Sequence, residues 1–117
     1  MKSVLVVDDS EDARTVLAET LRAEGYEVWE AAGGSEALEI LDHLESCVVL
    51  LDLVMPGTSG EDVLTELRQS GRLENIRVIV MSGLTHGIDT PGAHLVLTKP
   101  ISLHQIVSHL EHLCPPS

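Results

Sequence analysis

Short apolar runs alternate along the chain with longer segments in which apolar residues recur at helical spacing. Val4-Leu5-Val6-Val7 and Val48-Val49-Leu50-Leu51 have the length and branching of strands that are buried on both faces. Strand-like runs of this kind occupy residues 3–7, 27–31, 47–51, 77–81 and 94–97. Because a helix-like segment follows each strand-like run, the pattern predicts an α/β fold with five parallel strands wrapped by helices.

Four helices carry clear sequence signals, and we expect them at residues 10–24, 35–45, 59–71 and 102–113. The first is predicted to bury a stripe of apolar residues before it stops at Gly25, and the stripe consists of Ala13, Val16, Leu17 and Leu21. The last should begin with a capping box formed by Ser102 and Gln105.

The sequence signal is clear for the helix at residues 59–71 and weak for a further helix at residues 84–92. Residues 59–71 should bury Val63, Leu64 and Leu67 on one face. Residues 84–92, where the fourth helix of the repeat belongs, contain Gly87 and Pro91 and almost no apolar periodicity. We therefore expect a short or degenerate fourth helix.

Composition narrows the class of protein. A chain of 117 residues with 44% apolar content fits one domain spanning residues 1–117. The formal charge of −12 opposes direct nucleic-acid binding. No run approaches the about 18 apolar residues that span a bilayer, so we expect no membrane insertion. Cys47 and Cys114 suit ordinary reduced thiols, and we expect a cytoplasmic location.

Acidic residues follow two of the predicted strands. Asp8 and Asp9 come directly after the first apolar run, and Asp52 closes the third. The carboxyl ends of parallel strands meet at one edge of a sheet, where open sheets bind ligands. Because carboxylates held close together repel one another, a hard divalent cation such as magnesium would stabilise them. The alternative is that Asp8 and Asp9 merely cap the helix that follows.

Two further polar side chains follow the fourth and fifth predicted strands. Ser82 comes after Val78-Ile79-Val80-Met81, and Lys99 comes shortly after Leu95-Val96-Leu97. With the acids they would combine a nucleophilic carboxylate, metal ligands, a hydroxyl donor and a fixed positive charge. Phosphoryl transfer needs little beyond in-line positioning and charge neutralisation, which these groups can supply.

Four motifs at the ends of four predicted strands together resemble the signatures of response-regulator receiver domains. They are Val4-Leu5-Val6-Val7-Asp8-Asp9-Ser10, Leu50-Leu51-Asp52-Leu53-Val54-Met55-Pro56-Gly57-Thr58-Ser59-Gly60, Met81-Ser82-Gly83 and Gly92-Ala93-His94-Leu95-Val96-Leu97-Thr98-Lys99-Pro100. The resemblance covers essentially the whole chain, and it rests on the order of the four motifs because each alone is weak.

The resemblance implies a flavodoxin-like, doubly wound sheet of strand order 2-1-3-4-5. Asp52 would accept a phosphoryl group from a phosphohistidine on a histidine kinase or a histidine phosphotransfer protein. Mg²⁺ would be bound directly by Asp9 and Asp52, largely through water by Asp8, and by the backbone carbonyl of Val54.

The same resemblance gives roles to residues near the end of the chain. Ser82 would bind a phosphoryl oxygen, Lys99 would pair with the phosphoryl group, and the peptide bond before Pro100 would be cis. Such a domain is not an enzyme acting on an external substrate. It catalyses its own phosphorylation and slow dephosphorylation, and then relays the phosphoryl group or changes partner binding. The Pro115-Pro116 tail leaves open a place within a larger hybrid kinase.

The chain departs from the family pattern at three places. Val96 stands where receivers usually carry Tyr or Phe, and a β-branched side chain cannot reproduce the inward and outward positions of a large ring. The stretch from Ser82 to Lys99 is several residues shorter than usual. Val54 cannot orient an attacking water, so we expect a long-lived acyl phosphate. The first two departures favour phosphate relay, or a partner near the first helix, over dimerisation of an output domain.

Two other functions use similar residues. A magnesium-dependent phosphatase with an aspartyl nucleophile would need an Asp-x-Asp-x-Thr pattern after the first strand, and Asp8-Asp9-Ser10 lacks it. A receiver-like interaction module that is never phosphorylated would have no reason to keep all five site residues.

Overall fold

The computed structural model describes residues 3–44, 47–52, 60–71, 76–82, 95–98 and 102–113. Its sheet has the order β2-β1-β3-β4-β5, and every pair of neighbouring strands is parallel. The strands are β1 (Ser3–Val7), β2 (Glu27–Ala31), β3 (Cys47–Asp52), β4 (Ile76–Ser82) and β5 (Leu95–Thr98). The predicted five-stranded parallel sheet and its order are confirmed.

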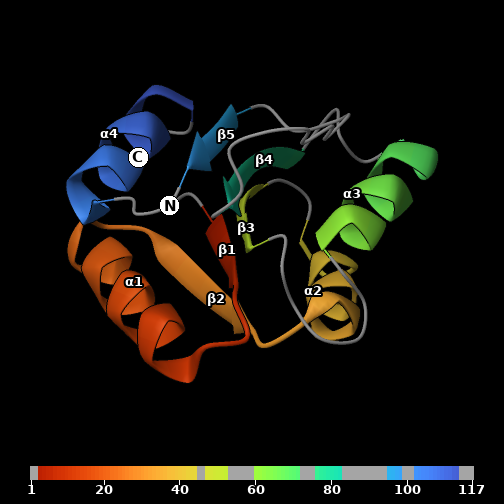
Figure 1. The fold of residues 1–117 in the computed structure, drawn as a ribbon, viewed down its shortest axis with the longest axis horizontal. Coiled ribbons are helices and arrows are strands. Elements are labelled where there is room, and N and C mark those ends of the chain that lie inside the picture. The colour runs from red at the N-terminus through yellow and green to blue at the C-terminus, as the bar shows by residue number, and fades with distance from the viewer. Residues whose placement is uncertain are drawn as a thin grey trace.

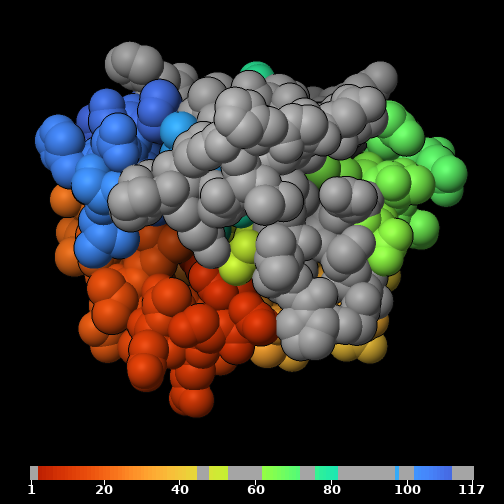
Figure 2. Space-filling view, viewed as in Figure 1, coloured from red at the N-terminus to blue at the C-terminus, as the bar shows by residue number. Residues whose placement is uncertain are grey.

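Helices cover both faces of this sheet (Figure 1). They are α1 (Glu11–Ala23), α2 (Gly34–Leu41), α3 (Gly60–Gln69) and α4 (Leu103–Leu113). Helices α1 and α4 pack on one face, and α2 and α3 pack on the other. In the space-filling view, α1 and α4 lie next to each other on one side of the molecule, and α3 lies on the opposite side (Figure 2).

The core alternates along each strand, as a sheet covered on both faces requires. In β1, Val4 and Val6 pack with α1 and α4, whereas Leu5 and Val7 pack with α2 and α3. All four side chains are fully buried. The continuous apolar runs of the sequence are therefore explained by burial on both sides rather than on one.

The ends of α1 show why the helix occupies these residues. Ser10 is the N-cap, and its Oγ accepts a hydrogen bond from the Ala13 N–H at 3.3 Å. At the other end, Gly25 has φ +98°, and the Tyr26 N–H donates to the Leu21 carbonyl at 3.2 Å. This left-handed ending satisfies the last carbonyls of the helix; the C-cap itself is Glu24, and the predicted Gly25 is the left-handed residue directly after it.

Two helix predictions are confirmed in detail. Ser102 and Gln105 form the capping box, with the Ser102 N–H donating to Gln105 Oε1 at 3.2 Å and the Gln105 N–H donating to Ser102 Oγ at 3.1 Å. The predicted apolar face of α3 is also buried, and it consists of Val63, Leu64 and Leu67.

Two other helix predictions are wrong in part. Helix α2 ends at Leu41, not near residue 45, because the chain tightens there into turns in which the His43 N–H donates to the Ile40 carbonyl. In α1 the buried stripe is Leu17, Ala18 and Leu21, while the predicted members Ala13 and Val16 are exposed. The helix is thus rotated relative to the expectation, and Arg14 rather than Ala13 begins its inner face. Residues 84–92, the expected site of the degenerate fourth helix, lie outside the described residues.

Within the described ranges, no helix combines the length and the apolar character needed to cross a bilayer.

Replacing a valine by alanine should lower the free energy of unfolding much more at Val6, in the core, than at Val16, on the surface of α1. Val6→Ala, at a side chain that is 0% exposed, should lower the free energy of unfolding by about 2 kcal/mol, because it removes two buried methyl groups and leaves a cavity. Val16→Ala, at a side chain that is 52% exposed, should change it by no more than about 0.5 kcal/mol. Urea unfolding of both variants measures the difference. Equal losses would contradict the orientation of α1 described above.

Candidate metal centre

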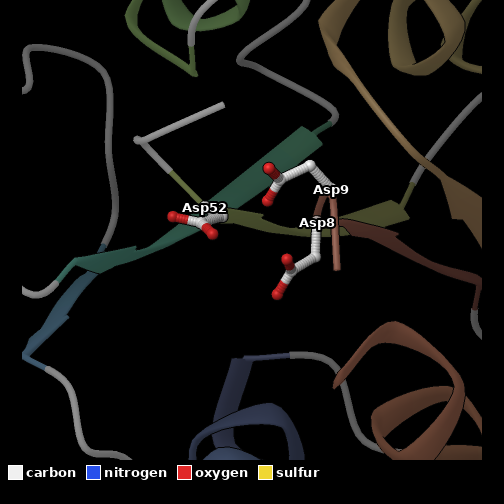
Figure 3. Close-up of side chains that lie close together, drawn as sticks. All are labelled: Asp8, Asp9 and Asp52. Atoms are coloured by element: carbon white, nitrogen blue, oxygen red, sulfur yellow. The ribbon is translucent and has the colours of Figure 1, made fainter. Parts of the chain in front are cut away.

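Three carboxylates converge where β1 and β3 end. The register pairs Val7 with Leu51, so Asp8 and Asp52 follow at the same level of two neighbouring parallel strands. One oxygen each of Asp8, Asp9 and Asp52 lies within 4.8 Å of the others, and the three side chains surround a common space (Figure 3). Asp8 and Asp52 are 7% and 5% exposed, and Asp9 is exposed. The sequence prediction that these acids meet at one edge is confirmed.

Hydrogen bonds fix both the backbone and the side chain of Asp8. Its N–H donates to the Ala31 carbonyl of β2 at 3.1 Å, which extends the ladder one residue beyond β1. Its Oδ1 accepts from the Ser10 N–H at 2.9 Å, the geometry of an Asx turn. The N-cap of α1 is Ser10, so the alternative in which Asp8 and Asp9 merely cap this helix is not what the structure shows.

Arg14, which was not among the predicted site residues, also reaches this corner of the sheet. Its Nη1 donates to the main-chain carbonyl of Asp8 at 2.9 Å, and its Nε lies 3.5 Å from Oε1 of Glu30 on β2. Arg14 shares the inner face of α1 with Leu17, Ala18 and Leu21, which follow it by three, four and seven residues. That spacing is the sequence signal for Arg14, and the predicted stripe, which begins at Ala13, lies one residue too early to include it.

The cluster has the chemistry of a site for a hard cation. Three negative charges within 4.8 Å repel one another, and two of them are shielded from solvent. A divalent ion would offset this repulsion, and carboxylate oxygens are the ligands that Mg²⁺ prefers. The donor set therefore fits magnesium.

Ser82 is placed near the cluster by its backbone alone. It is the last residue of β4, one beyond Met81, which pairs with Asp52, and it pairs with Thr98 of β5. The end of β4 therefore reaches the edge that carries the acids. Val54, Lys99 and Pro100 lie outside the described residues, as does most of the stretch between Ser82 and Lys99 that was expected to be shorter than usual.

Comparison with known proteins bears on what this edge does. A family model described as the response regulator receiver domain matches residues 4–111. The sensory transduction protein RegX3 of Mycobacterium tuberculosis is 36% identical over 115 aligned residues, which cover 94% of this chain and 49% of RegX3. The chain thus spans about half the length of the curated relatives it matches.

Solved structures agree with the family match. The response regulator TrrA from Thermotoga maritima, in complex with Mg(2+)-BeF, has a TM-score of 0.85 and 31% identity, covering 97% of this chain and 99% of TrrA. The receiver domain of the hybrid histidine kinase CckA has a TM-score of 0.78 and 34% identity, covering 94% and 96%. Fold, acid cluster and sequence therefore agree, and this chain belongs to the response regulator receiver domain family.

Proposed function

We propose that residues 1–117 form a receiver domain that accepts a phosphoryl group on Asp52 in two-component signalling. The observation that carries the proposal is the convergence of Asp8, Asp9 and Asp52 within 4.8 Å at the ends of β1 and β3. Family membership supports it, because the matched region includes all three acids. The donor would be a phosphohistidine on a histidine kinase or a histidine phosphotransfer protein.

Asp52 is the nucleophile in this proposal. One of its carboxylate oxygens attacks the phosphorus, the P–N bond of the phosphohistidine breaks, and the imidazole leaves with the electron pair of that bond. Asp52 suits the task because it ends β3, so the sheet fixes its backbone, and because the residue is only 5% exposed. A carboxylate with little solvent around it needs less reorganisation to reach the in-line geometry.

Asp8 and Asp9 would hold Mg²⁺ together with Asp52 and the backbone carbonyl of Val54. When bound, the ion would neutralise the phosphoryl oxygens as they approach three negative side chains. The TrrA structure, a complex with Mg(2+)-BeF, supports this assignment by analogy. Ser82 would donate to a phosphoryl oxygen, and Lys99 would supply the fixed positive charge.

Hydrolysis of the acyl phosphate would be slow, because Val54 offers no hydrogen bond to an attacking water. The domain would therefore catalyse its own phosphorylation and only slow dephosphorylation. A long-lived phosphoryl group favours relay to another protein or a change in partner binding.

Partner choice follows from charge and from the relatives. A net charge of −12 favours a basic or neutral partner surface over direct contact with nucleic acid. The likeness to the CckA receiver supports a place in a hybrid kinase, and the match to half of RegX3 equally supports a place in another kind of longer signalling protein. A cytoplasmic location is part of the same proposal.

Incubation with acetyl phosphate tests the proposal directly. Wild-type protein should gain the mass of one phosphoryl group in the presence of Mg²⁺. It should gain no mass when EDTA is added before the acetyl phosphate. Intact mass spectrometry measures both. Failure of modification with Mg²⁺ present would favour the unphosphorylated interaction module.

The phosphatase alternative predicts a different result. Purified protein with Mg²⁺ would then hydrolyse an external phosphomonoester such as para-nitrophenyl phosphate through many cycles. A receiver should release no more than about one equivalent of product per protein molecule under the same conditions.

A further inference from the structure

We infer that Arg14 is a positioning residue for the metal site, acting through the main chain of Asp8. The inference rests on the proposed function, because it concerns how the acids of that site are held. It starts from a hydrogen bond that joins the inner face of α1 to the end of β1.

The hydrogen bond falls on one particular peptide group. The Asp8 carbonyl, which accepts from Arg14 Nη1 at 2.9 Å, belongs to the peptide that links Asp8 to Asp9. The plane of this peptide sets the direction of the backbone between two carboxylates of the cluster. With the bonds from the Asp8 N–H to Ala31 and from the Ser10 N–H to Asp8 Oδ1, three contacts fix the backbone and side chain of Asp8.

Glu30 holds Arg14 in turn. Its Oε1 lies 3.5 Å from Arg14 Nε, and its Oε2 lies 3.3 Å from Nη2 of Arg22, which also donates to the Val28 carbonyl at 3.0 Å. The Arg14 side chain is 16% exposed and that of Arg22 is 49% exposed. Among the described residues, Arg14 contacts the acid cluster through the Asp8 carbonyl, whereas Arg22 contacts Glu30 and the Val28 carbonyl, so the pair offers a matched comparison.

Loss of the Arg14 side chain should change Mg²⁺ affinity in opposite directions, depending on whether its charge or its hydrogen bond to Asp8 matters more. A guanidinium beside the Asp8 carbonyl repels a divalent cation, so loss of its charge would by itself strengthen Mg²⁺ binding. If Arg14 instead fixes the Asp8–Asp9 peptide, its loss lets the two carboxylates sample other directions and weakens Mg²⁺ binding. Groups that orient metal ligands typically change metal affinity by about 10- to 100-fold when removed.

The test compares Arg14→Gln with Arg22→Gln by isothermal titration with Mg²⁺. Both changes remove one positive charge from α1 and one ion pair with Glu30. We expect roughly tenfold weaker binding for Arg14→Gln and no more than about a twofold change for Arg22→Gln. Arg14→Lys keeps the charge but lacks the fork that reaches Glu30 and Asp8 together, so it should also bind Mg²⁺ more weakly than wild type.

A spectroscopic measurement separates positioning from general destabilisation. The Asp9 N–H belongs to the peptide whose carbonyl Arg14 contacts. Its ¹⁵N resonance in metal-free protein should therefore shift in Arg14→Gln and stay in place in Arg22→Gln. Thermal unfolding in EDTA gives the stability of each variant, and Arg22→Gln controls for loss of the Glu30 pair.

The outcomes distinguish this inference from the proposed function. Equal or stronger Mg²⁺ binding by Arg14→Gln, with wild-type protein still phosphorylated by acetyl phosphate, overturns the inference and leaves the function intact. Weaker binding by Arg14→Gln, with wild-type protein never phosphorylated, supports the inference and overturns the function. Absence of Mg²⁺ binding to wild-type protein overturns both.

Discussion

Asp52→Asn should abolish phosphorylation by acetyl phosphate, so that the variant gains no phosphoryl mass while wild-type protein does. The amide has nearly the shape of the carboxylate but lacks the anionic oxygen that attacks phosphorus. The substitution also removes one of three mutually repelling charges, so the fold should be retained or stabilised. Intact mass spectrometry after incubation with Mg²⁺ provides the measurement, and circular dichroism confirms the fold.

Asp42→Asn is the matched control for this result. Asp42 is the C-cap of α2, and the chain continues from there to the amino end of β3, away from the carboxyl end that carries Asp52. Asp42→Asn should therefore leave phosphorylation unchanged. A negative charge at a helix C-terminus interacts unfavourably with the helix dipole. A phosphoryl group that persists in Asp52→Asn would place the acceptor elsewhere and refute the assigned nucleophile.

Asp9→Asn should raise stability without metal and remove the stabilisation that Mg²⁺ provides. In EDTA the variant should unfold at a higher temperature, by roughly 4 °C, because about 1 kcal/mol of repulsion is relieved at this exposed member of the cluster. Wild-type protein should gain about 2.7 kcal/mol when free Mg²⁺ reaches one hundred times its Kd. Asp9→Asn should show little of this gain. Thermal unfolding with and without Mg²⁺ measures both effects.

Asp12→Asn is a control that should change the stability in EDTA in the opposite direction. Asp12 lies in the first turn of α1, where a negative charge interacts favourably with the helix N-terminus. Its replacement should lower stability in EDTA by about 0.5 kcal/mol and leave the Mg²⁺ effect in place. If Asp9→Asn keeps the full response to Mg²⁺, Asp9 is not a ligand.

The strands were predictable because a strand that is buried on both faces is a continuous run of apolar residues, which can be recognised in the sequence without knowledge of the tertiary structure. The run Val48-Val49-Leu50-Leu51 can be satisfied only where helices cover both sides of a sheet, and it forms a central strand. Caps are equally local, since Ser102 and Gln105 bond to each other across three residues. Three strands have ends that differ from the prediction by one residue, as when Asp52 joined β3, because the ladder continues wherever a partner strand is present.

The buried face of α1 was less predictable than that of α3. Val16 was expected to be buried and is 52% exposed, because several rotations of α1 bury a similar number of apolar atoms. The packing of α1 against β1 and β2 selects the rotation in which Leu17, Ala18 and Leu21 face inward. That same rotation brings Arg14 against the Asp8 carbonyl.

The sequence by itself determined which segments are strands, where the helices begin, and that Asp8, Asp9 and Asp52 each stand at a strand's carboxyl end. These features depend on neighbours along the chain, and local spacing encodes them. Only the tertiary structure decided that the three acids lie within 4.8 Å and that Arg14 holds the peptide between two of them. The physical reason is that such contacts join segments distant in sequence, and their geometry follows from strand register and helix rotation, which packing alone fixes.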